Sequence, residues 1–165
     1  IYPMASAQIQ QMLGIPQAAG FDVTAACTGF AVANITASQF LQTGMCHNAL
    51  VIGSDIHSRV TDWTDRNTCV LFGDGAGAFI LSANDEPNRF LAGQLNLDGT
   101  KGDWLQLKTR LENAPMVPAR DVVSPFVSMN GREIFKFAVS SVPDSIRQTV
   151  KQAGLTLADI DFVVL

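Results

Sequence analysis

The segment 30–41 constrains the fold most, because it has the composition of a helix that is apolar on almost every side. Its apolar residues point in nearly all directions around a helix axis, and they are Phe30, Val32, Ala33, Ile35, Ala37, Phe40 and Leu41. A helix of this kind suits the interior of a protein better than its surface. We therefore predict a central helix, covered by other elements and ended by Gly44.

Short apolar runs on both sides of this helix predict strands that would cover it. Continuous apolar runs of this length are typical of buried strands. Strands are predicted at residues 21–23, 49–53, 70–72, 78–81, 90–97 and 161–165. Helices are also predicted at 4–13 and 131–154, the latter kinked or restarted at Pro143. This order of helices and strands predicts a layered α/β fold, with residues 108–125 as a surface loop.

Composition excludes several classes of protein. With 47% hydrophobic and 16% charged residues and a mean hydropathy of +0.19, the 165 residues are expected to fold as a globular domain. A net charge of −4 argues against nucleic acid as a partner. No apolar stretch approaches the roughly 18 residues that a membrane span needs, so a membrane protein is not expected.

The three cysteines, Cys27, Cys46 and Cys69, are odd in number and show no C-x-x-C spacing. This usage predicts no disulfide framework and a reducing, cytoplasmic location. With His47 and His57 the cysteines form no converging ligand set, so no metal site is predicted. Because the chain begins without Met and ends on a strand-like run, we expect an excerpt of a longer protein.

Cys27 is the strongest candidate for chemistry, because it falls where a predicted strand turns into the central helix. Backbone N–H groups and the helix dipole at such a junction favour the nucleophilic thiolate. A buried structural thiol explains the same residue, and both interpretations stay open here. The glycine-rich run 73–78 lacks the spacing of a nucleotide loop and favours close backbone packing instead.

Several motifs, in order and spacing, resemble β-ketoacyl-acyl carrier protein synthase III. They are Phe21-Asp22-Val23, Ala26-Cys27-Thr28-Gly29-Phe30, Asp65-Arg66-Asn67-Thr68, the run 71–78 and the run 130–137. The resemblance implies a thiolase-like layered αβαβα fold, present here only in its central part. Residues 1–86 would then be the latter part of the N-terminal half and 87–165 the first part of the C-terminal half. It also implies a homodimer.

The resemblance implies a chemistry for Cys27. In the family this cysteine accepts the acyl group of an acyl-CoA, and a carbanion from malonyl-acyl carrier protein then attacks the acyl-enzyme. No cofactor is implied, and the partners are acyl-CoA and acyl carrier protein. The family's catalytic His and Asn have no counterpart here, since the motif His-Gln-Ala-Asn would follow Leu165. We therefore expect that the 165 residues alone do not condense substrates.

Further positions match substrate-binding residues of the family. Arg66 matches a residue beside the CoA adenine, Tyr2 one that reaches across the dimer, and Lys136 one that receives the carrier protein. The remaining matches, of which the apolar ones have an equally simple explanation as core, are Leu71, Phe72, Leu105, Gly131 and Phe135. Rival hypotheses are a type III polyketide synthase, a hydroxymethylglutaryl-CoA synthase, a quinolone-type condensing enzyme and a non-catalytic module.

Overall fold

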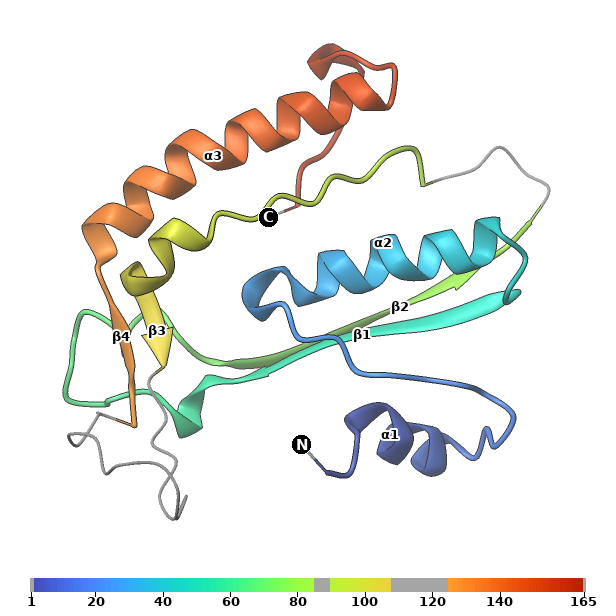
Figure 1. Cartoon of the computed structure of the whole chain (residues 1–165), viewed down its shortest axis with the longest axis horizontal. Helices are drawn as coiled ribbons and strands as arrows, with labels where there is room; N and C mark the ends of the chain where they lie inside the picture. The colour runs from blue at the N-terminus through green and yellow to red at the C-terminus, as the bar shows by residue number, and fades with distance from the viewer. Residues whose placement is uncertain (1, 85–89, 108–124, 165) are drawn as a thin grey trace. The chain divides into compact units, whose positions relative to one another are not determined.

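A computed structural model describes residues 2–84, 90–107 and 125–164 and divides the chain into two compact units (Figure 1). The first unit comprises Ile1–Gly53 and Gly77–Asp85, and the second comprises Ser54–Ala76 and Glu86–Leu165. Most of the predicted loop at 108–125 lies outside the described residues. The assignment of residues 1–86 and 87–165 to two thiolase-like halves stays a prediction.

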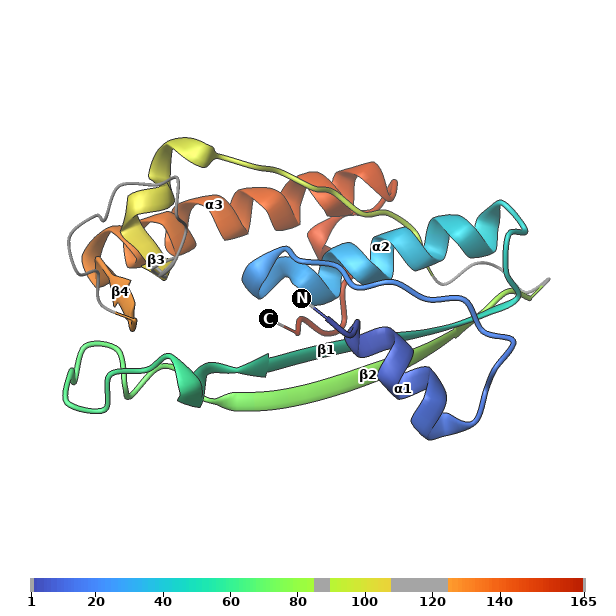
Figure 2. The same ribbon diagram turned by 60° about the horizontal axis from the view of Figure 1, so that its bottom comes forward.

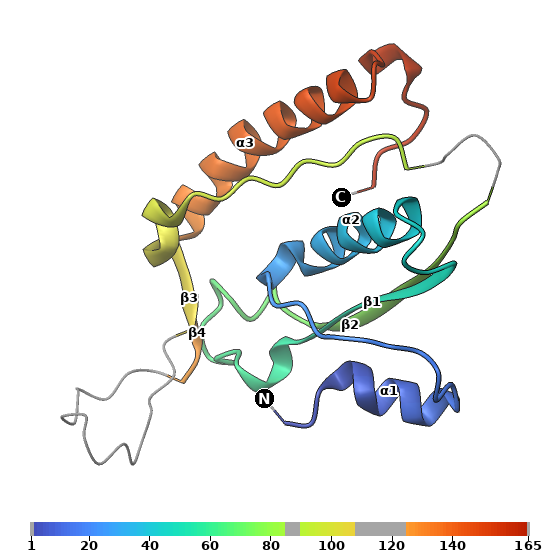
Figure 3. The ribbon, with the colours of Figure 1, turned by 45° about the vertical axis from the view of Figure 1, so that its right-hand side comes forward.

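Two helices and a two-stranded sheet build the first unit. Helix α1 spans Ala5–Leu13 and helix α2 spans Gly29–Gln42, as predicted. Strand β1 (Asn48–Ile56) pairs with strand β2 (Asp74–Ser82), and both run on from this unit into the second. In this unit α2 lies on one side of the strands and α1 on the other (Figures 1 and 3). The predicted strands 49–53 and 78–81 are therefore confirmed.

Apolar contacts hold α2 against the strands. The rings of Phe30 in α2 and Phe79 in β2 meet edge-on, with their centroids 5.0 Å apart. Gly53 of β1 lies so close to Phe30 that a Cβ there would stand 3.0 Å from its ring. Of α2, Ala37 and Ser38 are buried, and most of the other residues are half-buried. The predicted covering of this helix is thus complete only at its middle.

The second unit contains a short two-stranded sheet and the longest helix. Strands β3 (Leu105–Leu107) and β4 (Val127–Met129) pair antiparallel, with Leu105 opposite Met129. Helix α3 spans Gly131–Gln152 and runs through Pro143 without a restart. Residues 90–98 run beside α3 (Figure 2), where the Gln94 amide donates to Gln148 at 2.7 Å. Short 3-10 helices are η1 (Ala26–Thr28) in the first unit and, in the second, η2 (His57–Arg59), η3 (Gly99–Trp104) and η4 (Leu157–Asp159).

Several predicted strands were wrong. Residues 70–72 form a turn, because the N–H groups of Leu71 and Phe72 donate to the Thr68 carbonyl and cannot join a ladder. Residues 21–23, 90–97 and 161–164 also carry no strand among the described residues. An apolar run becomes a strand only where a neighbouring strand pairs with it. Strands β3 and β4 were missed because three residues are too few for a visible alternation.

The glycine-rich run also differs from its prediction. Residues 73–78 were expected to pack closely against the backbone, between predicted strands at 70–72 and 78–81, but β2 already begins at Asp74. Gly75 and Gly77 therefore lie inside a strand, and a Cβ at either would meet no atom within 4 Å.

Of the described helices, none combines the length and the apolar character that crossing a bilayer would take.

Candidate active site

A tight turn places Cys27 at the start of α2. The N–H and the hydroxyl of Thr28 both donate to the Ala25 carbonyl, at 3.1 and 2.8 Å, and close the turn around Ala26 and Cys27. Ala26 has a φ of 46°, the only positive φ of a non-glycine residue among those described. A left-handed alanine is uncommon and costs backbone energy. The turn therefore holds Cys27 in a geometry that the local sequence does not favour by itself.

The segment that leads into this turn is held from two sides. The Asp22 carboxylate accepts the N–H groups of Ala5 at 2.8 Å and Ser6 at 2.9 Å, at the start of α1. These bonds, that from Ser6 above all, lower the pKa of Asp22. The Phe21 ring meets Phe40 of α2 edge-on at 6.1 Å. The predicted strand at 21–23 is thus an extended segment that side chains fix in place.

Cys27 is accessible, and it differs in this from the other two cysteines. Its side chain is exposed, whereas Cys46 and Cys69 are half-buried. The Thr28 side chain turns back to Ala25 and does not cap α2. Because η1 runs directly into α2, the N–H groups of Thr28 and Gly29 donate back to the carbonyls of Ala25 and Ala26. A thiol exposed at this turn can attack the carbonyl carbon of a ligand.

Two consecutive turns carry Arg66. The Asp62 side chain accepts the N–H and the hydroxyl of Thr64, and the Asp65 side chain accepts the N–H and the amide of Asn67. The pKa of Asp62 is lowered chiefly by the Thr64 hydroxyl, and that of Asp65 chiefly by the Asn67 N–H. Arg66 is exposed on the second turn. Its backbone is thus held by short-range hydrogen bonds.

Leu71 and Phe72 follow these turns. Hydrogen bonds of Asp74 and Gly73, just after them, tie the segment 57–74 back to its own start. The Asp74 carboxylate accepts the N–H of Ser58 at 2.8 Å and its hydroxyl at 2.7 Å. These bonds, the N–H first, lower the pKa of Asp74. The His57 Nδ1 lies 3.2 Å from the Gly73 carbonyl, which only accepts, so we assign the proton to Nδ1. The His57 ring also contacts Phe72 at 5.2 Å between centroids.

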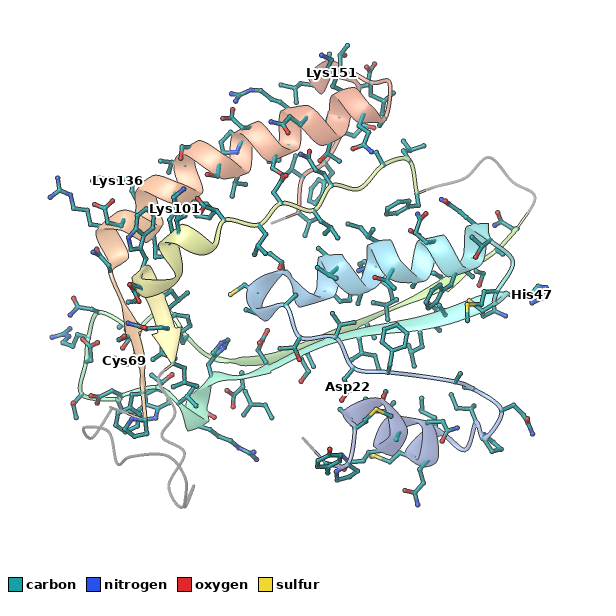
Figure 4. The ribbon with its side chains drawn as sticks, viewed as in Figure 1. Asp22, His47, Cys69, Lys101, Lys136 and Lys151 are labelled. Carbon is teal, nitrogen blue, oxygen red and sulfur yellow. The ribbon has the colours of Figure 1, made fainter. Side chains whose placement is uncertain are left out.

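Leu105 lies in the short sheet, and Gly131, Phe135 and Lys136 lie in the first two turns of α3. Leu105 faces Met129 in the sheet, and a Cβ on Gly131 would stand 3.5 Å from the Met129 side chain. Phe135 is 68% exposed. The Lys136 ammonium pairs with Glu133 at 2.6 Å, and Figure 4 shows Lys136 at the N-terminal part of α3.

The candidates are divided between the two units. Cys27 and Tyr2, which is 99% exposed, belong to the first unit. The second unit holds Arg66, Leu71, Phe72, Leu105, Gly131, Phe135 and Lys136.

A pocket between α1 and residues 18–20 is lined by none of the candidates. Within the described ranges, no group of three or more His, Cys, Asp or Glu residues could hold a metal ion.

Comparison with known proteins gives a consistent relationship. The sequence model of the family 3-oxoacyl-[acyl-carrier-protein (ACP)] synthase III matches residues 21–99. The β-ketoacyl-[acyl-carrier-protein] synthase III of Microcystis aeruginosa is 45% identical over 98% of this chain and 49% of that protein. The enzyme of the same name from Clostridium acetobutylicum is 44% identical over 98% of this chain and 50% of that protein. The chain is a relative of the synthase III enzymes.

Solved structures of synthase III enzymes support the fold. The synthase III of Thermus thermophilus superposes with a TM-score of 0.85 and 34% identity, over 97% of this chain and 49% of that one. The priming β-ketosynthase of the R1128 polyketide pathway gives 0.84 and 33%, over 96% and 46%. The chain thus has part of the thiolase-like α/β fold, as predicted, and spans about half the length of these synthase III relatives.

Two features of the site were not predicted. The left-handed backbone of Ala26 leaves no signal in the sequence, because alanine is not a residue that turns of this kind prefer. The bonds of Asp62 and Asp65 could have been found, since Asp followed two residues later by Thr or Asn is typical of a side-chain-stabilised turn.

Proposed function

We propose that the protein is an acyltransferase of fatty-acid initiation of the β-ketoacyl-acyl carrier protein synthase III type, with Cys27 as the acyl-accepting nucleophile. One observation carries the proposal: the exposed thiol of Cys27 directly follows the left-handed Ala26 in η1, just before α2, in a chain similar to these enzymes. Backbone outliers of this kind are concentrated at functional sites.

The first half-reaction transfers an acyl group. The Cys27 sulfur attacks the carbonyl carbon of an acyl-CoA, a new sulfur–carbon bond forms, and the bond to the CoA sulfur breaks. The proton of the thiol leaves with CoA as its thiol. The N–H of Cys27 supports the reaction by donating to the oxygen that becomes negative.

The second half-reaction forms the carbon–carbon bond. Malonyl-acyl carrier protein loses CO2, and its carbanion attacks the acyl carbon on Cys27. The products are β-ketoacyl-acyl carrier protein and the free thiolate, and no cofactor is consumed. His47 and His57 do not match the family's catalytic histidine, so we expect the 165 residues to accept an acyl group without condensing it.

The remaining candidates receive roles on the basis of the resemblance. Arg66 lies beside the CoA adenine, and Lys136 receives the acidic carrier protein. The walls of the acyl and pantetheine channel are formed by Leu71, Phe72, Leu105 and Phe135, and Gly131 is a further substrate-binding position. Tyr2 closes the pocket of a second subunit in a cytoplasmic homodimer. Residues 1–86 and 87–165 belong to the two thiolase-like halves.

One rival deserves a separate test because a related structure favours it. The R1128 protein, 33% identical over 96% of this chain, primes a polyketide pathway. A protein of that kind uses the same cysteine chemistry with a different carrier protein. Comparing condensation rates with a fatty-acid carrier protein and a polyketide carrier protein distinguishes the two. Type III polyketide synthases and hydroxymethylglutaryl-CoA synthases are distinguished by their use of CoA thioesters in place of the carrier protein.

The test of the proposal is acyl transfer to Cys27. The protein expressed from its complete reading frame is incubated with acetyl-CoA and with longer acyl-CoAs, without a malonyl donor. Peptide mapping by mass spectrometry should find one acyl group per chain, on Cys27. The variant Cys27→Ser should carry no thioester, while Cys46→Ser and Cys69→Ser should be labelled as the wild type is. The proposal would be overturned if no donor labelled the protein, or if the label persisted in Cys27→Ser.

A second pair of variants tests the turn. Ala26→Gly keeps the left-handed backbone at no steric cost, whereas Ala26→Val places a β-branched residue where it is strongly disfavoured. We expect Ala26→Gly to acylate at about the wild-type rate. The rate should fall at least about tenfold in Ala26→Val, because small displacements of a nucleophile slow attack strongly. Equal rates in both variants would show that the turn geometry is irrelevant.

A further inference from the structure

A lysine in the second unit contacts aromatic rings from two different elements. The Lys101 ammonium lies 5.6 Å from the centroid of the Trp104 ring in η3 and 5.3 Å from that of Phe137 in α3. It also lies 2.7 Å from a carboxylate oxygen of Asp98. We call these four residues the Lys101 cluster, and Figure 4 shows Lys101 beside the N-terminal part of α3.

Asp98 fixes the position of the cation. Its carboxylate caps η3 by accepting the Thr100 N–H at 3.0 Å, and it also accepts the Thr100 hydroxyl. The hydrogen bond from Lys101, with those from Thr100, lowers the pKa of Asp98 to about 2. The carboxylate is therefore charged at any physiological pH. Asp98 therefore positions the Lys101 ammonium independently of the two rings. The Lys101 side chain is 38% exposed.

Two of the contacts between η3 and the start of α3 bear on the position of this helix. The first is a backbone bond, in which the Asn130 N–H, just before α3, donates to the Trp104 carbonyl at 2.7 Å. The second is the contact of Lys101 with Phe137, in the second turn of α3. The Gln94 amide also donates to Gln148, further along α3. Among these contacts, that of Lys101 with Phe137 bears on the rotation of the N-terminal turns of α3.

The rotation of α3 decides where its candidate site residues point. Successive residues of an α-helix are about 100° apart around the axis. Lys136 is therefore about 100° from Phe137, and Phe135 is on nearly the opposite side of α3. Their exposures agree, since Phe137 is 39% exposed and Phe135 68%. A helix that holds Phe137 against η3 presents Phe135 to the other side.

We propose that Lys101 is a positioning residue, whose ammonium, held by Asp98 between Trp104 and Phe137, sets the rotation of α3 and so the orientation of Phe135 and Lys136. The inference rests on the proposed function, because it assigns to Phe135 and Lys136 the channel wall and the carrier-protein contact. Lys101 touches no substrate in this role. It acts through α3 alone.

Kinetics of the complete protein provide the first test. Lys101→Met removes the charge and keeps the length of the side chain, and Lys101→Arg keeps a cation that also stacks on aromatic rings. Lys151→Met, in the last turn of the same helix, is the matched control. For Lys101→Met we expect KM for acyl-CoA and for malonyl-acyl carrier protein to rise about three- to tenfold at nearly unchanged kcat. Lys101→Arg should recover most of this loss, and Lys151→Met should show none.

A second test does not depend on activity. Every tryptophan of the complete protein other than Trp104 is first replaced by Phe, Trp63 among them, so that Trp104 is the single indole. In that background the Trp104 indole N–H resonance and the amide resonances of residues 134–138 should move on Lys101→Met. They should stay in place on Lys151→Met. Unmoved resonances on Lys101→Met would show that the cluster does not hold α3, and would overturn the inference whatever the kinetics.

The two tests separate the inference from the proposed function. If the wild type transfers no acyl group from any donor, the proposed function fails, and the resonances still decide whether Lys101 holds α3. If the resonances move while both KM values stay unchanged, α3 is held by Lys101 but its rotation does not position a substrate site. That outcome, or equal losses in Lys101→Met and Lys101→Arg, overturns the positioning role.

Discussion

The two units bury different kinds of side chain. Among the described residues of the first unit, Ala37 and Ser38 of α2 and Val51 of β1 are buried, and two of these three are apolar. In the second, the most buried side chains are polar: Thr61 is 2% exposed and Thr68 is 1% exposed. Both threonines lie in the segment 57–74, the segment that carries Arg66 and Phe72. Of the described residues, the first unit thus buries apolar as well as polar side chains, whereas the segment 57–74, here called the polar region, buries only polar ones.

The partners in the two regions also differ in their distance along the chain. The Thr61 hydroxyl donates to the His57 carbonyl at 2.7 Å, four residues away. The Thr68 hydroxyl donates to Asp65, three residues away. In the first unit the contact between Phe30 and Phe79 joins residues far apart in sequence. The segment 57–74 can therefore form much of its structure locally, whereas the surroundings of Cys27 depend on correct packing of distant elements.

Of the substitutions that test this comparison, Gly53→Ala is expected to have the largest effect on stability. A Cβ at this position would lie 3.0–3.2 Å from three atoms of Phe30, including its own Cβ, which cannot move aside cheaply. We expect Gly53→Ala to lower the free energy of unfolding by about 1–3 kcal/mol, the usual cost of overpacking. Thermal or urea unfolding of the complete protein measures it. Because the displaced Phe30 begins α2, acylation of Cys27 should slow as well.

Gly77 offers the matched control. It lies in β2 in the same unit, and a Cβ there would meet nothing within 4 Å. Gly77→Ala should therefore leave the stability unchanged or raise it slightly, because alanine loses less backbone entropy on folding. If Gly53→Ala proves as harmless as Gly77→Ala, the contact between α2 and the strands does not hold α2 in place.

A smaller loss is expected in the polar region. Thr61→Val removes the hydroxyl that donates to His57 and keeps the shape of the buried side chain. We expect a loss of about 1 kcal/mol in unfolding free energy, the typical contribution of one hydrogen bond. Thr43→Val removes a similar bond, to Gln39 at 2.9 Å, at an exposed position and should cost less. Equal costs at both sites would mean that burial of Thr61 adds nothing.

The local sequence predicted the helices much better than the strands. The apolar pattern of residues 30–41 and the glycine after Leu13 act over a few residues, so α1 and α2 could be placed. Residues 90–97 carry an equally clear apolar pattern, yet they lie beside α3 without a strand ladder in the described part of the chain. A strand depends on a partner that the local sequence does not specify.

The candidate site shows the same limit. Position within a strand-to-helix junction was enough to single out Cys27, and the structure places it, exposed, at the start of α2. The turn that holds Cys27 depends on the positive φ of Ala26, which the residue types in this segment do not predict. The Lys101 cluster combines a local pair, Asp98 and Lys101, with a ring 36 residues further along. Only the local part was open to prediction.

Acid provides the finest comparison, because the carboxylates of the polar region titrate. Hydrogen bonds lower the pKa of Asp62, Asp65 and Asp74 below the ordinary value of 3.8. A carboxyl group whose pKa is lower in the folded state stabilises that state above its unfolded pKa. This stabilisation is lost as the pH falls below 3.8 and through the folded values. The turns of residues 57–74 should therefore loosen in acid, while the apolar contact of Phe30 with Phe79 has no titrating group.

Amide resonances measure this titration residue by residue. The N–H groups of Thr64, Asn67 and Ser58 donate to the three carboxylates, so each should report a midpoint below 3.8. Asp65→Asn should abolish the titration seen at Asn67. It should also move the midpoint at Thr64 further down, because the charge of Asp65 raises the pKa of Asp62. If the midpoint at Thr64 is the same in Asp65→Asn and in the wild type, the two turns are electrostatically independent. The polar region would then consist of two separate structures.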